Sequence, residues 1–218
     1  MAQQMLISHS SYVTGAAVIA AGPYFCAGGS LEISRDACVA NASKIDAMQL
    51  VDMTFALGDM EHIDNPEHLE KAKVFLLAGK HDERVNPEVV KKTQEFYEFF
   101  LPAENVKAEY EIAAGHGIPT ESHGCECRES RRPLLNNCGY NTAYALLSHI
   151  YGHLEKPSSD VELKGEFIEF DQREYFDDSN VAISMSGFGA GYVPSACRDQ
   201  SGAACGVLVQ MESLSYQN

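Results

Sequence analysis

The chain has 218 residues, of which 16 are Lys or Arg and 31 are Asp or Glu, so its formal net charge at pH 7 is −15. This acidic balance disfavours nucleic acid as a partner, because binding to phosphates depends on Lys and Arg. Apolar residues make up 45% and charged residues 22% of the sequence, which is typical of a globular domain. No apolar run approaches the roughly 18 residues of a membrane span, so we expect no membrane segment.

Three short apolar segments predict strands that are buried on both faces. They are Val13–Ala20, Val74–Ala78 and Val106–Ile112. Helical patterns follow these segments: apolar residues recur at helical spacing over 47–55 and 143–154. Asn86 followed by Pro87 marks another helix start, and Asn141 is a second candidate cap. The alternation predicts an α/β fold with a mostly parallel sheet and helices on both faces.

After Pro157 the sequence changes to short strand-like pieces separated by Gly, Ser and Asp. The pieces are Glu166–Phe170, Gly191–Val193 and Val207–Val209. We find no internal repeat and no long linker. We therefore expect a single domain over residues 1–218, with a core at 1–156 and a strand-rich tail at 157–218.

Six of the seven cysteines lie in pairs across short loops that contain Gly or Ser. The pairs are Cys26 with Cys38, Cys127 with Cys138, and Cys197 with Cys205, and Cys125 is left over. This spacing predicts local disulfides, which require an oxidising compartment and so place the parent protein outside the cell or in a periplasm. The first residues lack the character of a signal peptide. We therefore expect the chain to begin inside a longer protein.

Two residues that can do acid–base chemistry follow neighbouring predicted strands. Asp82 lies in the loop after Val74–Ala78, and His116 lies in the loop after Val106–Ile112. Adjacent parallel strands bring such loops together, and a carboxylate that accepts a hydrogen bond from one imidazole nitrogen leaves the other free to serve a nucleophile. The alternative is that Asp82 only caps a turn and His116 is an ordinary loop histidine.

The order Asp then His, followed by a last amphipathic helix, matches the second half of an α/β-hydrolase triad, whose serine comes first. Residues Met1–His9 are interpreted as the helix that follows the nucleophile. The serine would then lie immediately before Met1. Ser184, Ser186, Ser8 and Ser10 lack the Gly-x-Ser-x-Gly frame and are poor substitutes.

Several motifs in order resemble the extracellular poly(3-hydroxybutyrate) depolymerases and their esterase relatives. The matching segments are Gly15–Ala27, Gly79–Val85, Gly115-His116, Pro119-Thr120, Asn137–Asn141, Ile150–Gly152, Phe170–Gln172 and Gly191–Pro194 with Cys197. The resemblance covers nearly the whole chain. It implies a circularly permuted α/β hydrolase that cleaves esters of 3-hydroxy acids through Ser, His and Asp without a cofactor, on a polyester or a small ester. Asp82 would be the orienting acid and His116 the general base.

Two parts of the family pattern are missing from this sequence. The nucleophile elbow is represented only by its following Met, as Met1, and the strand around Val207–Met211 continues as Glu212–Ser215 instead of a His-Gly-Cys segment that supplies an oxyanion donor. The permuted fold is thus expected to be incomplete. We expect the chain by itself to hydrolyse esters poorly or not at all. A feruloyl or acetylxylan esterase and a non-catalytic binding remnant are the alternatives.

Two other groups of residues have functional and structural interpretations. Tyr24 and Phe25 follow the first strand and either line an apolar cleft for acyl chains or pack beside Cys26. The group around His116, His123 and the nearby cysteines resembles a zinc site only loosely, because Cys-x-Cys is tighter than the usual Cys-x2-Cys. We therefore assign no metal.

Overall fold

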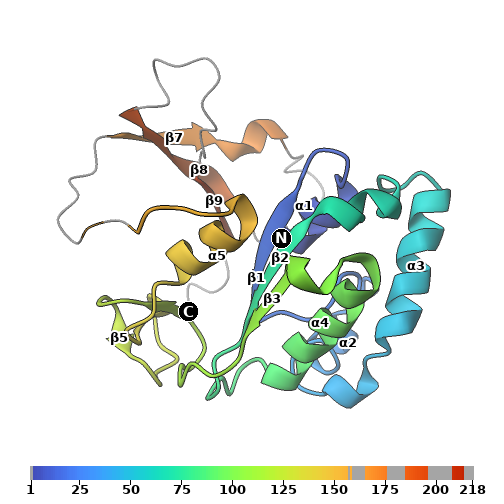
Figure 1. Ribbon diagram of the computed structural model, residues 1–218, viewed down its shortest axis with the longest axis horizontal. Helices are drawn as coiled ribbons and strands as arrows, with labels where there is room; N and C mark the ends of the chain where they lie inside the picture. Colours follow the sequence, from blue (N-terminus) through green and yellow to red (C-terminus); the bar gives the residue numbers. More distant parts are fainter. Residues whose placement is uncertain (1, 157, 159–164, 176–184, 196–207, 214–218) are drawn as a thin grey trace. The chain divides into compact units, whose positions relative to one another are not determined.

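The computed structural model describes residues 2–156, 158, 165–175, 185–195 and 208–213 (Figure 1). The chain divides into two compact units, residues 1–156 and 157–218, which are described separately below. The division falls where the sequence changes character, after Lys156. That the two units form one domain stays a prediction.

A three-stranded parallel sheet lies at the centre of the first unit (Figure 1). Its strands are β1 (Gly15–Ile19), β2 (Lys73–Leu77) and β3 (Val106–Glu109), in the order β1-β2-β3. All three predicted strands are confirmed, and their pairing is parallel as expected. β3 is shorter than predicted, because the backbone beyond Glu109 bonds to the loop after β2 instead of continuing the ladder: the amide of Lys80 donates to the carbonyl of Ile112.

The main core lies on one face of this sheet. Alternate strand residues, among them Val18, Val74 and Leu76, point to the same side and are almost completely buried. Facing them are α1 (Ala2–Ser8) and α4 (Pro87–Phe100), with α3 (Ala47–Asp59) outside α4. The buried helix residues are Leu6, Ile7, Val51, Val90, Phe96 and Tyr97. Each such side chain stabilises the fold by roughly 1.5–3 kcal/mol through removal from water.

Helix α5 (Thr142–Tyr151) covers the opposite face of the sheet (Figure 1). A Cβ added to Gly15 would lie 2.8 Å from Ile150 Cγ2, so the close approach of helix and strand requires glycine there. The predicted apolar stripe is incompletely covered, because Leu147 is 40% and Tyr151 is 64% exposed. The helix ends before Leu154, since Gly152 has a φ of 92°.

The two helix starts marked by asparagine are confirmed. Asn86 Oδ1 accepts the amide of Glu88 at 3.0 Å and begins α4, and Asn141 Oδ1 accepts the amide of Tyr144 at 3.0 Å and begins α5. Both satisfy amides that the first turn leaves unpaired. The remaining short helices of this unit are α2 (Leu31–Arg35), η1 (Ala42–Lys44), η2 (Pro66–Lys71) and η3 (Ala103–Asn105).

A second small parallel sheet was not predicted. Its strands are β4 (Ile118–Thr120), β5 (Cys125–Glu126) and β6 (Leu135–Asn137), in the order β4-β6-β5. The strands are two or three residues long and mix polar with apolar residues, so they are too short to show alternation or an apolar run. They lie in the segment that follows His116 and precedes α5.

The second unit contains an antiparallel sheet, β7 (Gly165–Asp171), β8 (Met185–Pro194) and β9 (Leu208–Ser213), in sequence order. η4 (Gln172–Tyr175) follows β7. The strand-like pieces of the tail are thus confirmed as strands, except that Val207 lies outside the described residues, and the strands pair antiparallel. The circular permutation stays a prediction. Among the described residues, no helix is long and apolar enough to cross a bilayer.

Candidate active site

Asp82 and His116 meet at the carboxyl ends of two adjacent strands. Asp82 follows β2, His116 follows β3, and His116 Nδ1 lies 2.9 Å from Asp82 Oδ2. The Asp82 side chain is 1% exposed and that of His116 is 23% exposed. The contact predicted from the sequence is therefore present, with the carboxylate buried and the imidazole partly open to solvent.

The backbones of the two loops are bonded directly to each other. The amide of Lys80 donates to the carbonyl of Ile112 at 2.8 Å, and the amide of His81 donates to the carbonyl of Ala114 at 2.9 Å. A Cβ on Gly79 would lie 2.4 Å from that Ala114 oxygen. Glycine at position 79 is thus what allows the loop of the acid to pass this close to the loop of the imidazole.

Both oxygens of Asp82 are engaged. Oδ1 accepts the amides of Arg84 and Val85, each at 2.9 Å, and Oδ2 faces the imidazole. Burial raises the pKa of this carboxyl, but the hydrogen bonds from His116, Val85 and Arg84 outweigh it and hold the pKa below its ordinary value of 3.8. Asp82 is consequently ionised at neutral pH.

This geometry fixes the tautomer of His116. An ionised carboxylate only accepts hydrogen bonds, so Nδ1 carries the proton and donates to Asp82 Oδ2. In the neutral ring Nε2 is then an acceptor, which is the state a general base requires. In the described part of the chain, no side-chain hydroxyl is hydrogen-bonded to Nε2.

Tyr24 and Phe25 have different surroundings. Tyr24 is 4% exposed and belongs to the main core, which favours the packing interpretation for this residue. Phe25 has a φ of 58°, is 36% exposed, and lines a surface depression of about 230 Å³. The lining residues of this depression come from Gln4 and the segment 22–38 and include neither Asp82 nor His116.

Two of the three predicted disulfides are confirmed. Cys26 is bonded to Cys38 and Cys127 to Cys138, and Cys125 is a free, buried cysteine as expected. Cys197 and Cys205 lie outside the described residues.

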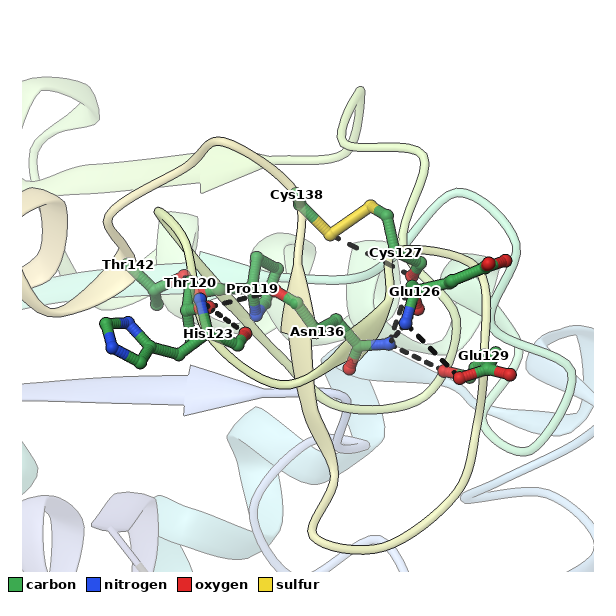
Figure 2. Close-up of a disulfide and its surroundings, with 9 residues drawn as sticks. All are labelled: Pro119, Thr120, His123, Glu126, Cys127, Glu129, Asn136, Cys138 and Thr142. Carbon is green, nitrogen blue, oxygen red and sulfur yellow. Dashed lines mark hydrogen bonds between the residues drawn. A yellow bond between two sulfur atoms is a disulfide. The ribbon is translucent and has the colours of Figure 1, made fainter.

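The Cys127–Cys138 disulfide, shown in Figure 2, occupies two of the thiols considered for zinc. Within the described ranges, His, Cys, Asp and Glu form no cluster of three or more that could hold a metal ion.

Sequence reasoning missed Ser130, which touches both loops of the pair. Its Oγ accepts the backbone amide of His116 at 2.8 Å, and its carbonyl oxygen accepts Arg84 Nη2 at 2.5 Å. No periodicity or motif in the sequence distinguishes this serine from others. Only the path of the loop brings it to His116.

Comparison with known proteins identifies relatives for almost all of the chain, although no protein-family model matches it. It is 32% identical over 206 residues to a poly(3-hydroxybutyrate) depolymerase of Delftia acidovorans, which covers 94% of this chain and 41% of the relative. A polyhydroxybutyrate depolymerase of Talaromyces funiculosus is 29% identical over 90% of this chain and 56% of its own length. The chain therefore spans about half the length of these relatives.

Two solved structures have the same fold. One is a serine-to-alanine variant of PHB depolymerase complexed with an R3HB trimer, with a TM-score of 0.77 and 26% identity over 90% of this chain and 60% of the other. The second is the PHB depolymerase of Penicillium funiculosum, with a TM-score of 0.75 and 25% identity over 89% of this chain and 59% of the other.

The parallel sheet and the Asp–His pair at its carboxyl edge define an α/β-hydrolase-like protein. The two structural matches confirm this fold class. Within it, the chain is homologous to the poly(3-hydroxybutyrate) depolymerases, as its motifs indicated.

Proposed function

We propose that this chain carries the acid and the general base of a serine esterase that hydrolyses 3-hydroxyalkanoate esters. The observation that carries the proposal is the 2.9 Å contact between His116 Nδ1 and the buried carboxylate of Asp82. In this assignment Asp82 orients the ring and stabilises the imidazolium, and His116 Nε2 accepts the proton of an attacking hydroxyl. The ester is cleaved by acyl transfer to that hydroxyl and then to water.

The substrate class is proposed from the relatives. Both curated matches are depolymerases of poly(3-hydroxybutyrate), and one solved relative is complexed with an R3HB trimer. We therefore place 3-hydroxybutyrate esters ahead of feruloyl and acetylxylan esters. The p-nitrophenyl ester of 3-hydroxybutyrate is expected to react faster than the matching ferulate, and the reverse order would move the assignment to the other substrate class.

An extracellular or periplasmic location is part of the same proposal. Two disulfides are formed within the described residues, and such bonds persist in oxidising compartments.

The assignment of the pair is tested with p-nitrophenyl acetate, an ester so activated that a basic imidazole attacks it even without a serine. The rate constant per protein is compared for the unmodified chain, His116→Ala and Asp82→Asn. We expect His116→Ala to remove most of the rate. Asp82→Asn is expected to lower it too, because the asparagine amide would donate to Nδ1 and move the ring proton to Nε2.

His62→Ala is the matched control, since His62 is exposed and outside the pair. Its rate is expected to equal that of the unmodified chain. A rate that neither His116→Ala nor Asp82→Asn changes would eliminate the proposed roles of both residues.

A further inference from the structure

The loop closed by the Cys127–Cys138 disulfide is hydrogen-bonded to both loops of the proposed acid–base pair, through backbone amides beside His116 and through the Arg84 side chain near Asp82. The amide of Gly115 donates to the Cys127 carbonyl at 2.8 Å, and the next amide, that of His116, donates to Ser130 Oγ at 2.8 Å. From the acid side, Arg84 Nη2 donates to the Ser130 carbonyl at 2.5 Å. Ser130 is thus the residue of this loop that contacts both the Asp82 loop and the His116 backbone.

The buried side chain of Asn136 is hydrogen-bonded to the backbone of this loop. It is 1% exposed, and its Nδ2 lies within hydrogen-bond distance of the carbonyl oxygens of Glu126, Cys127 and Glu129, at 3.3, 3.0 and 2.6 Å. Figure 2 shows the Asn136 amide directed at this segment, beside the disulfide. A buried side chain that satisfies several backbone carbonyls fixes the local path of the chain, because unpaired carbonyls are costly there. Ser130 directly follows the segment so fixed.

The glycines on either side of His116 show how closely the loop approaches. A Cβ on Gly115 would lie 2.4 Å from the Arg128 carbonyl oxygen and 2.8 Å from Ser130 Oγ. A Cβ on Gly117 would lie 1.9 Å from Asn136 Oδ1. The backbone of residues 115–117 therefore lies directly against Ser130 and Asn136.

We propose that Ser130 is a positioning residue that holds the His116 backbone where its ring meets Asp82, with Asn136 keeping Ser130 in place. The proposal rests on the proposed function of the pair, because it assigns Ser130 an effect on the geometry of that pair and no contact with the reacting ester. Loss of the Ser130 hydroxyl leaves the His116 amide without its acceptor. The ring is then free to move away from the carboxylate.

The test compares the unmodified chain with Ser130→Ala, Ser130→Thr and Ser30→Ala. Two NMR signals report on the pair: the downfield proton on His116 Nδ1, and the carboxyl carbon of Asp82 followed through acid titration. Ser130→Ala is expected to weaken or abolish the Nδ1 proton signal. It is also expected to raise the titration midpoint of Asp82 toward 3.8, because the hydrogen bond from His116 helps to lower that pKa.

Ser130→Thr keeps a hydroxyl at the same position and is expected to restore both signals. Ser30→Ala removes a hydrogen bond of the same kind, from the Ile33 amide to Ser30 Oγ, at the start of α2, and is expected to leave both signals unchanged. Asn136 is buried, so its variants risk unfolding and are not needed. Circular dichroism confirms that each variant is folded.

The proposal is overturned if Ser130→Ala keeps both signals, if Ser30→Ala loses them equally, or if Ser130→Thr fails to restore them. These outcomes differ from a failure of the proposed function. If the unmodified chain shows no Nδ1 proton bonded to Asp82, the acid–base pair itself is wrong. If that proton is present and survives Ser130→Ala, only the positioning role is wrong.

Discussion

Asp82 differs from the other acidic residues that the structure describes, because it is buried and both of its carboxylate oxygens are hydrogen-bonded. Asp36 and Asp64 also have lowered pKa values, but they owe this to side-chain hydrogen bonds, with Lys44 and with Ser11, at the exposed surface. At Asp82 burial opposes ionisation, and three donors overcome it. The electrostatic free energy of the interaction between this ionised carboxylate and the imidazole therefore depends on both groups.

We predict a defined pH dependence for this carboxylate. Because its folded pKa lies below 3.8, its contribution to the free energy of unfolding is complete at neutral pH and is lost as the pH falls below about 4 through the folded pKa. Asp82→Asn is expected to lower the free energy of unfolding at pH 7 by roughly 1.5–3 kcal/mol, the range for hydrogen bonds to a charged group.

Urea denaturation of the two proteins between pH 7 and pH 3 measures this difference. The difference should stay nearly constant down to about pH 4 and then shrink as the pH falls through the folded pKa. A difference that grows as the pH falls would mean that the folded pKa of Asp82 is raised.

The contact between Asp82 and His116 could be predicted from the sequence, because both residues follow adjacent parallel strands that end at the same edge of the sheet. The roles of Ser130 and Asn136 could not be predicted from the sequence. Their roles arise from the path of a loop whose strands are only two or three residues long, too short for spacing or a hydrophobic pattern to be recognised. A clue was available in Gly115 and Gly117, which flank the histidine and allow close backbone approach.

Capping residues determine where the two helices α4 and α5 begin. Asn86 begins α4, the helix whose Phe96 and Tyr97 fill the core, and it also donates Nδ2 to the Ala40 carbonyl at 3.0 Å. The Asn-Pro pair made this start predictable from sequence. Which aromatic residues of the helix face the core was less predictable, because Phe99 is 50% exposed although it continues the aromatic run of the core.

We predict that Asn86→Ala lowers the free energy of unfolding by about 1 kcal/mol, the usual cost of removing an N-cap. The change is measured by thermal or urea unfolding, with Glu104→Ala as the control, since Glu104 lies in η3 and caps no helix. An effect of Asn86→Ala no larger than that of the control would show that the cap contributes nothing to α4.

The two disulfides form a matched pair of elements, with sequence separations of 12 and 11 residues. Loop-closure entropy is therefore nearly equal for both, and we expect each double Cys→Ser variant to lose about 2–4 kcal/mol of stability. Only the variant lacking Cys127–Cys138 is expected to lower the rate with p-nitrophenyl acetate, because Cys127 is bonded to the backbone beside His116.

The rate and the free energy of unfolding are measured on the same samples, under conditions where both variants are folded. Equal rates for the two double variants would contradict the coupling between this loop and the imidazole.

In the part of the chain that the structure describes, the buried hydrophobic clusters belong to the first unit. Every residue of the two buried clusters lies between Leu6 and Leu101, whereas the described strand β7 is largely exposed. The α/β order of the first unit was readable from its alternating patterns. The antiparallel pairing of the tail was not, since isolated short strands do not specify their partners.

We predict that a chain ending at Lys156 keeps a cooperative unfolding transition and the Asp82–His116 contact, because the described buried clusters and the pair both lie within that unit. Calorimetry measures the cooperativity of unfolding, and the NMR signals of the His116 ring report on the contact with Asp82. A non-cooperative transition in the shortened chain would show that residues 157–218 are required for the core.

The buried carboxylate of Asp82 fixes the proton of His116 on Nδ1 and leaves Nε2 unprotonated. Nitrogen-15 NMR of the histidine rings in the unmodified chain, recorded at a pH where the ring is neutral, measures this directly. We predict a protonated Nδ1, with a proton that exchanges slowly with water, and an unprotonated Nε2. A proton found on Nε2, or rapid averaging between the two nitrogens, would contradict the claim.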